Sequence, residues 1–270
     1  MMFLGTGKTV TLVESIKQIW RLDESSYIIA CSSNNLAADI LAERLSEHVN
    51  KAHILRLYNR TRHFNQVPSK LVAISNFDSV KKEVFFPASS KLQSYRIIVC
   101  SIVTYGRLLV QSDFNAKHIT HLFIDEAAQT QEPEILIPIV HLMEFNKFFK
   151  VVLAGDPQQL GSIVHSPIAK QYGLERSLLE RLIKNGLYLD KNEYLSQAYD
   201  EKFCVKLLNN YRSHRAIIEV PKTLFYANEL NECAGEFRNL FPCLNWSLLP
   251  NKDFPLIFHP IYGREERECK

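Results

Sequence analysis

Short apolar runs separated by helical patterns constrain the fold of this 270-residue sequence more than any other feature. Four of these runs are rich in β-branched and aromatic residues: Tyr27–Ala30, Ile97–Cys100, Leu122–Ile124 and Val151–Ala154. Because they lack polar alternation, they are typical of strands that are buried on both faces. Such strands, alternating with helices, predict an α/β fold built on a parallel, doubly wound sheet.

Two segments between the runs carry apolar residues at helical spacing. The apolar positions of the first segment are Leu12, Val13, Ile16, Ile19 and Trp20. Those of the second are Leu36, Ile40, Leu41 and Leu45, with Asp39, Glu43 and Arg44 off the apolar face. Each pattern predicts a helix packed against the sheet.

Two breaks in this rhythm predict the domain organisation. Residues at about 58–95 are polar and contain two prolines, which indicates an insertion rather than a layer of the sheet. A second polar, turn-rich segment covers residues 186–197. We therefore expect a first domain at residues 1–188 and a second, incomplete domain at residues 189–270.

The composition narrows the class of protein without naming its partner. The chain is 46% hydrophobic and 23% charged, as soluble globular proteins are, and its net charge of +3 allows a nucleic-acid partner without requiring one. Its six cysteines are scattered and no zinc-binding spacing occurs, so we expect free thiols in a reducing compartment. Without a long apolar run or a signal peptide, we expect a cytoplasmic protein that does not bind membranes.

The start of the chain contains half of a phosphate-binding loop, G-x-x-x-x-G-K-[ST], in which Met2 stands where the first glycine belongs. The matching residues are Gly5, Thr6, Gly7, Lys8 and Thr9. Glycines let backbone N–H groups face phosphate oxygens, the lysine supplies a positive charge, and the threonine hydroxyl is a ligand for Mg²⁺. An accidental match in a loop is the alternative.

Two further motifs follow predicted strands. Asp125 and Glu126 end an apolar strand, where an ATPase places its Mg²⁺ ligand and the base that activates water, although paired acids also occur at helix N-termini. Gly155–Gln159 follows the next strand and could sense the γ-phosphate, or could form an ordinary turn. Because the carboxyl ends of parallel strands share one edge of a sheet, the three motifs together predict a site for ATP and Mg²⁺.

Five segments, in order, resemble motifs I, Ia, II, III and IV of superfamily 1 helicases: GTGKT, CSSNNLAAD, DEAAQ, GDPQQLG and NNYRSH. Within that superfamily the chain resembles the nonsense-decay-helicase-like branch, and in particular the Moloney leukaemia virus 10/Armitage group of RNA helicases. The resemblance implies two RecA-like P-loop NTPase domains with ATP between them. It also implies single-stranded RNA across the top of these domains and movement from 5′ to 3′.

The resemblance implies roles for individual residues. Lys8 and Thr9 match ligands of phosphate and Mg²⁺, Asp125 matches the metal ligand, and Glu126 matches the catalytic base. Gln159 matches the residue that couples the γ-phosphate to the domain interface.

Arg212 matches an arginine that reaches the γ-phosphate from the second domain, although a surface arginine on a helix is the alternative. The nucleic-acid contacts implied by motifs Ia and Ib are Ser32, Ser33, Asn34, Ser101 and Thr104. By themselves the first three could equally form a helix cap.

Departures from the family pattern suggest a piece of a longer gene product. The usual G-P-P before GTGKT is replaced by Met2–Leu4, and Cys31-Ser32 stands where Ala-Pro is usual. We expect the strand that leads into the phosphate loop to lie upstream, and motifs V and VI to lie downstream.

The expected function is that of an ATP-dependent RNA helicase core, acting in RNA silencing or mRNA turnover, which does not unwind duplexes as this fragment alone. The resemblance implies ATP and Mg²⁺ as cofactors, single-stranded RNA and Argonaute-type silencing proteins as partners, and a cytoplasmic location that includes ribonucleoprotein granules. The alternatives are an ATP- and RNA-binding module without unwinding activity, and a DNA helicase. No short motif separates RNA from DNA, because the two differ only at the 2′-OH.

Overall fold

The computed structural model describes residues 5–110, 114–184, 200, 202–235, 242–252 and 254–264. The chain divides into two compact units, of which the first runs from Gly7 to Leu207. The second contains Leu208–Lys270 and also takes in Gly5 and Thr6. The predicted boundary between residues 188 and 189 lies outside the described residues.

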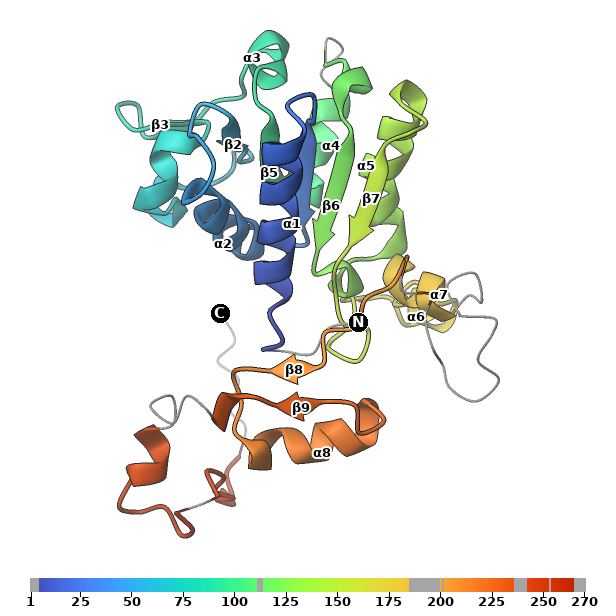
Figure 1. The fold of residues 1–270 in the computed structure, drawn as a ribbon. Coiled ribbons are helices and arrows are strands. Elements are labelled where there is room, and N and C mark those ends of the chain that lie inside the picture. The colour runs from blue at the N-terminus through green and yellow to red at the C-terminus, as the bar shows by residue number, and fades with distance from the viewer. Residues whose placement is uncertain are drawn as a thin grey trace. The chain divides into compact units, whose positions relative to one another are not determined.

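A five-stranded parallel sheet forms the centre of the first unit (Figure 1). Its order is β2-β5-β1-β6-β7. The strands are β1 (Ile28–Ser32), β2 (Ile54–Arg56), β5 (Ile97–Ser101), β6 (His121–Asp125) and β7 (Lys150–Leu153). The predicted parallel, doubly wound sheet of a RecA-like domain is thereby confirmed, and the four apolar runs coincide with β1, β5, β6 and β7 within a residue or two. Sequence reasoning missed β2, which is only three residues long and ends in a buried arginine.

Helices cover both faces of this sheet (Figure 1). The helices of one face are α1 (Lys8–Leu22) and α2 (Asn35–Ser46). Those of the other are α4 (Ile102–Val110) and α5 (Glu132–Phe145). Successive strand residues alternate between the two layers: Ile28 and Ala30 pack under α1 and α2, whereas Ile29 and Cys31 belong to the opposite cluster. Burying each large side chain contributes about 1.5–3 kcal/mol, so the two cores together stabilise the sheet.

Helix α2 is rotated relative to its predicted orientation. Leu41 and Leu45 are buried as expected, but Leu36 and Ile40 are 70% and 41% exposed, and Asp39 is buried instead. The prediction was wrong because Asp39 has a buried partner on β2, Arg56, described below. The small Ala38 and Ala42 side chains also let the helix approach the sheet closely.

The segment predicted as an insertion, at about 58–95, adds no strand to the five-stranded sheet. It contains the 3₁₀ turns η1 (Phe64–Gln66) and η2 (Ser69–Ile74), the antiparallel pair β3 (Phe77–Asp78) and β4 (Glu83–Val84), and helix α3 (Ser89–Gln93). Leu71 and Ile74 of η2 join the core beneath α2. This segment is therefore anchored to the first unit by its own apolar residues.

Two short helices and two 3₁₀ turns complete the described part of the first unit. They are η3 (Ala116–His118), η4 (Ala127–Gln129), α6 (Pro167–Gln171) and α7 (Leu178–Lys184). Turn η4 lies directly after β6, and the buried Leu178 and Leu179 of α7 pack in the same core cluster as Ala127 and Ala128 of that turn.

The described part of the second unit is small. It contains the parallel pair β8 (Asn209–Asn210) and β9 (Asn231–Glu232), helix α8 (Arg215–Phe225) and the turn η7 (Pro242–Asn245). Helix α8 exposes the apolar side chains of Leu224 and Phe225. Throughout the described residues of both units, each helix is too short or too polar to cross a membrane.

Candidate nucleotide and nucleic-acid sites

Three strands end side by side at the carboxyl edge of the sheet. Ser32 of β1 is in register with Ser101 of β5 on one side and with Asp125 of β6 on the other. The parallel sheet therefore aligns residues predicted from motifs Ia, Ib and II across adjacent strands. Ligands of open α/β sheets bind at this edge.

The phosphate loop is described in two parts, since Gly5 and Thr6 group with the second unit and Gly7, Lys8 and Thr9 with the first. Gly5 and Gly7 have φ of 87° and 90°, a left-handed conformation that glycine adopts without strain. Gly7 is the N-cap residue of helix α1, and within the described part of the chain it makes no side-chain capping bond. The first N–H groups of α1 are therefore available to an anion, as in other phosphate-binding loops.

Lys8 and Glu126 form an ion pair between motifs I and II. The Lys8 Nζ lies 3.2 Å from Glu126 Oε1, and the Gln129 amide donates to Glu126 Oε2 at 3.2 Å. Lys8 is buried and Glu126 half-buried. The two charged groups, 118 positions apart in sequence, thus converge on the space at the strand ends.

The backbone turns sharply after β6, and this turn directs the Glu126 side chain toward Lys8. Glu126 has φ of 53°, which costs a non-glycine residue about 1–2 kcal/mol. Asp125 is buried, and its Oδ1 accepts a hydrogen bond from the Glu126 N–H at 2.9 Å. Burial, with a smaller effect from the charge of Glu126, raises the pKa of Asp125 above its ordinary value.

These residues suit Mg²⁺ bound together with a nucleotide. A buried carboxylate whose charge lacks a full partner, as the raised pKa of Asp125 indicates, gains most from a nearby cation. Mg²⁺ is commonly held by one or two protein oxygens together with substrate phosphates and water. Asp125 and the Thr9 hydroxyl are oxygen ligands of this kind. Among the described residues no group of three or more His, Cys, Asp or Glu side chains is arranged to hold a metal.

The motif III loop packs directly against motif II. A Cβ at Gly155 would lie 2.8 Å from the Ala128 N and from a methyl group of Leu179, so only glycine fits there. The Ala127 N–H also donates to the Ala154 carbonyl at 2.8 Å. The loops that follow β6 and β7 therefore pack tightly against each other.

Asp156 holds the predicted motif III residue in place. Its Oδ2 accepts from the Gln159 side-chain amide at 2.8 Å, and its Oδ1 accepts from the Gln158 N–H at 3.0 Å. Sequence reasoning placed Asp156 only in a turn and did not predict this restraint. The observable signal was the Gly-Asp-Pro sequence, in which aspartate commonly bonds the backbone two residues on.

A hollow of about 330 Å³ lies beside the ends of β1 and β5. We call it the motif hollow; its lining residues are Ser33, Asn34, Asn35, Asn59, Thr61, Arg62, Gln66, Ser101, Val103 and Thr104. It brings together four of the residues predicted to bind nucleic acid, namely Ser33, Asn34, Ser101 and Thr104. Ser32 is fully buried instead, and its Oγ has no hydrogen-bond partner among the described residues.

Two of these residues also cap helices. The Asn34 side chain accepts from the Ala37 N–H at 2.9 Å at the start of α2. The Ser101 Oγ accepts from the Thr104 N–H at 3.2 Å at the start of α4. The helix-cap alternative for motif Ia is therefore correct for Asn34, and it is compatible with a binding role because the capped helix ends face the same hollow.

Arg212 lies in the second unit, just before helix α8. Its N–H donates to the Asn210 Oδ1 at 3.0 Å, and the Ser213 N–H donates to the same oxygen at 2.8 Å. Asn210 is fully buried, so this turn is well fixed within its unit. The role of Arg212 at the γ-phosphate stays a prediction.

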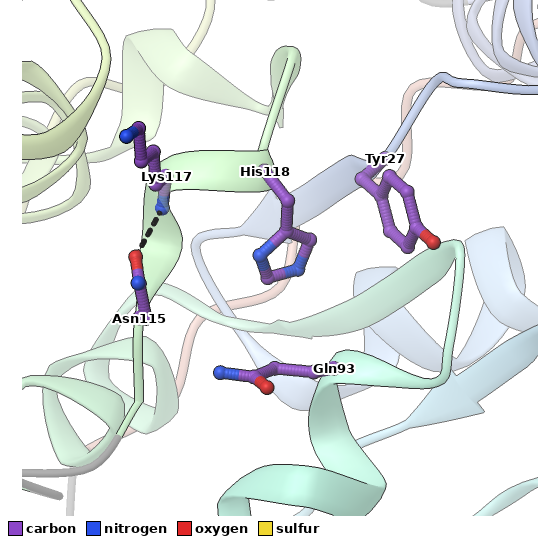
Figure 2. Close-up of a pocket in the computed structure, with 5 residues that line it drawn as sticks. All are labelled: Tyr27, Gln93, Asn115, Lys117 and His118. Carbon is purple, nitrogen blue, oxygen red and sulfur yellow. Dashed lines mark hydrogen bonds between the residues drawn. The ribbon is translucent and has the colours of Figure 1, made fainter.

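A second hollow, of about 400 Å³, lies at the opposite edge of the sheet (Figure 2). We call it the His118 hollow; it is lined by Tyr27, Gln93, Asn115, Lys117 and His118, which all precede strands. Figure 2 shows the His118 ring beside Tyr27, and the ring centroids are 4.7 Å apart. Burial lowers the pKa of His118, which keeps its ring neutral at pH 7. No predicted motif falls in this hollow.

Two family models, each described as an AAA domain, match the chain, one at residues 4–86 and 75–167 and the other at residues 174–270. The protein mov-10-B.1 of Danio rerio, named as a helicase, is 44% identical over 98% of the chain. The chain belongs to the MOV-10 and Armitage family of helicases. Other members are the RNA helicase Mov10l1 of Mus musculus, 38% identical over 98% of the chain, and the RNA helicase armi of Drosophila melanogaster, 35% identical over 84%.

Membership of the MOV-10 and Armitage family confirms the resemblance that the motifs indicated. The chain spans about a fifth to a quarter of the length of these relatives: 26% of mov-10-B.1, 22% of Mov10l1 and 20% of armi.

Proposed function

We propose that the chain is part of the core of an ATP-dependent RNA helicase, in which the first unit binds Mg·ATP and the backbone of single-stranded RNA. The observation that carries this proposal is the convergence of Lys8 and Glu126, which joins motifs I and II at the carboxyl edge of the sheet. The names of the relatives Mov10l1 and armi, both RNA helicases, support RNA over DNA.

In this proposal Lys8 exchanges its partner when nucleotide binds. A lysine that holds β- and γ-phosphate oxygens leaves Glu126, whose carboxylate then orients a water molecule and accepts its proton. The water oxygen bonds to the γ-phosphorus as the bond to the bridging oxygen breaks, which gives ADP and phosphate. Asp125 and Thr9 would hold Mg²⁺, which would supply positive charge to offset that of the phosphates.

Motor action would add the second unit to this site. Arg212 would stabilise the charge that develops on the γ-phosphate, and Gln159 would leave Asp156 to report the state of the nucleotide. Movement from 5′ to 3′, a role in silencing with Argonaute-type partners and a cytoplasmic location are further parts of the proposal, and only the family resemblance supports them.

The test is the Glu126→Gln variant, assayed for Mg·ATP affinity by calorimetry and for RNA-stimulated ATP hydrolysis. Glutamine keeps the shape of the side chain but cannot accept the proton of water, so we expect hydrolysis to fall by about 10²–10⁴-fold. Affinity should be kept or rise, because Lys8 no longer has to leave a carboxylate.

The matched control is Glu144→Gln, a charge removal at an exposed position on α5, which should change neither quantity. Hydrolysis at the unmodified rate by the Glu126→Gln protein would remove Glu126 from the role of base.

A further inference from the structure

The third wall of the motif hollow comes from a segment that no motif covers. Asn59, Thr61, Arg62 and Gln66 line it opposite the residues of motifs Ia and Ib. They follow β2 and lie in the segment predicted as an insertion, at about 58–95. The motif hollow thus has three sides, of which motif Ia forms one, motif Ib the second and residues 59–66 the third.

A buried cluster fixes this wall to helix α2. We define the Asp39 cluster as Asp39, Arg56, Tyr58 and Arg62. Asp39 Oδ1 accepts from the Arg56 Nε at 2.8 Å and from the Tyr58 hydroxyl at 2.9 Å. Asp39 Oδ2 accepts from the Arg62 Nη2 at 3.0 Å.

The rest of the cluster is equally well restrained. The Arg62 Nη2 also donates to the Gln66 carbonyl at 2.7 Å, which closes the loop between them. Burial raises the pKa of Tyr58 well above its usual range, so its hydroxyl stays protonated and remains a donor to Asp39. Arg62 is thus held in position before any ligand arrives, which lowers the entropy cost of binding.

The charges of the cluster do not balance. Two guanidinium groups, which are always protonated, face the single carboxylate of Asp39. Arg56 is 0% exposed. Its Nη1 and Nη2 groups donate to the Asn35 side chain and to the Asn35 and Leu57 carbonyls. The surplus positive charge therefore belongs to Arg62, whose side chain is 18% exposed at the hollow.

Arg62 also has donors left for a ligand. Both of its hydrogen bonds to described residues use Nη2, so its other terminal nitrogen, Nη1, carries the donors that are left. The residues that line the hollow include no aspartate or glutamate, and they supply hydroxyl and amide groups instead. The N-termini of α2 and α4, both at the hollow, add partial positive charge.

We propose that the segment Asn59–Gln66 binds the backbone of single-stranded RNA beside Ser33, Asn34, Ser101 and Thr104, with Arg62 as its phosphate-binding residue. One surplus cation, neutral polar neighbours and two helix N-termini fit a phosphodiester, which carries a single negative charge and is flanked by sugar oxygens. This inference rests on the proposed function, because it extends the RNA site of the same helicase core.

The experiment measures binding of the chain to a fluorescent oligouridylate by anisotropy, over a series of salt concentrations. Arg62→Ala should weaken binding about tenfold, as expected for a lost hydrogen bond to a charged group. It should also reduce the slope of log affinity against log salt by about one phosphate contact. Arg62→Lys keeps the charge and a partner for Asp39, so it should fold and keep the slope. It should bind more weakly than arginine, because a compact ammonium group lacks the planar, spread donors of a guanidinium.

Two control variants remove a positive charge elsewhere. Arg60→Ala lies two residues away and does not line the hollow, and Lys117→Ala lies in the His118 hollow. Equal losses for Arg60→Ala and Arg62→Ala would overturn the inference, since they would indicate general attraction. The loss for Arg62→Ala should be the same on a matched oligodeoxyuridylate; a loss confined to RNA would overturn the assignment to phosphate.

The two proposals fail in different ways. If the unsubstituted chain binds no RNA, the proposed function is wrong. If it binds RNA and Arg62→Ala binds as well as the unsubstituted chain, with an unchanged salt slope, only the role of Arg62 is wrong. Unchanged melting temperature and unchanged Mg·ATP affinity of Arg62→Ala would show that a loss of RNA binding is local.

Discussion

The motif hollow and the His118 hollow lie at opposite edges of one sheet and are of similar size, yet they differ in the polarity of what surrounds them. At the carboxyl edge, where the motif hollow lies, helices α2 and α4 begin and present N–H groups. At the other edge, where strands begin, helices α1 and α3 end at Leu22 and Gln93, so their last carbonyl groups lie on that side. The two hollows therefore differ little in volume. They differ in the direction of the helix dipoles around them, which favours anions at the carboxyl edge.

The largest effect expected from this difference concerns Lys8. Lys8→Ala should abolish measurable binding of Mg·ATP by calorimetry, because the lysine supplies the charge for the β- and γ-phosphates. Lys117→Ala removes the same charge at the other edge and should bind nucleotide as the unsubstituted chain does. Equal affinity of Lys8→Ala and the unsubstituted chain would refute the nucleotide site and, with it, the functional difference between the two edges.

A smaller effect is expected on stability at Asp125. Its folded-state pKa is raised by burial, so in the interval between the unfolded and folded values the native state binds more protons than the unfolded state. Its contribution to stability is therefore present at low pH and lost as pH rises through the folded value. Asp125→Asn keeps an oxygen for the Glu126 N–H and removes the buried charge, so it should melt a few degrees higher at pH 7, by about 1 kcal/mol.

The control for Asp125→Asn is to repeat the comparison with the unsubstituted chain at a pH where the carboxyl group is protonated. Scanning calorimetry at pH 3.5 should show the two proteins melting within about a degree of each other, because the carboxyl group is then protonated. A gain in melting temperature that is the same at both pH values would show that the charge of Asp125 is not what destabilises the edge. Loss of Mg·ATP binding should accompany the gain in stability.

The smallest effect is expected in the His118 hollow. Burial lowers the pKa of His118, so below the ordinary histidine value near 6.5 the unfolded state takes up a proton that the native state resists. Stability should therefore fall as pH drops through this region, and His118→Gln should flatten the fall slightly in urea denaturation at pH 5.5 and pH 7.5. Nucleotide affinity should not change, and a change would mean that the two edges are coupled.

The sequence was sufficient for the central strands and for the edge at which the motifs meet. Apolar β-branched runs predict buried parallel strands, and parallel strands bring Ser32, Ser101 and Asp125 to the same edge without further information. The convergence of Lys8 and Glu126 follows from the same rule, although their ion pair does not, because it depends on the left-handed turn of Glu126.

Long-range polar pairing could not be predicted. Periodicity placed Asp39 off the apolar face of α2, and its burial depends on Arg56, which lies on a strand too short to recognise. The place of Arg62 in the motif hollow depends in turn on Asp39. Side-chain pairs between distant segments leave no periodic signal in one sequence. The contribution of residues 59–66 to the motif hollow could therefore not be predicted.

The Asp39 cluster has a mechanical consequence for the proposed RNA site. Tension applied at Arg62 does not stretch a loose loop, because the guanidinium is tied to Asp39 and to the Gln66 carbonyl. A load at Arg62 would pass through the Asp39 carboxylate into helix α2, and through Arg56 into β2, the edge strand of the sheet. The loop at about 58–66 is in this way tied to the helix and strand beneath it.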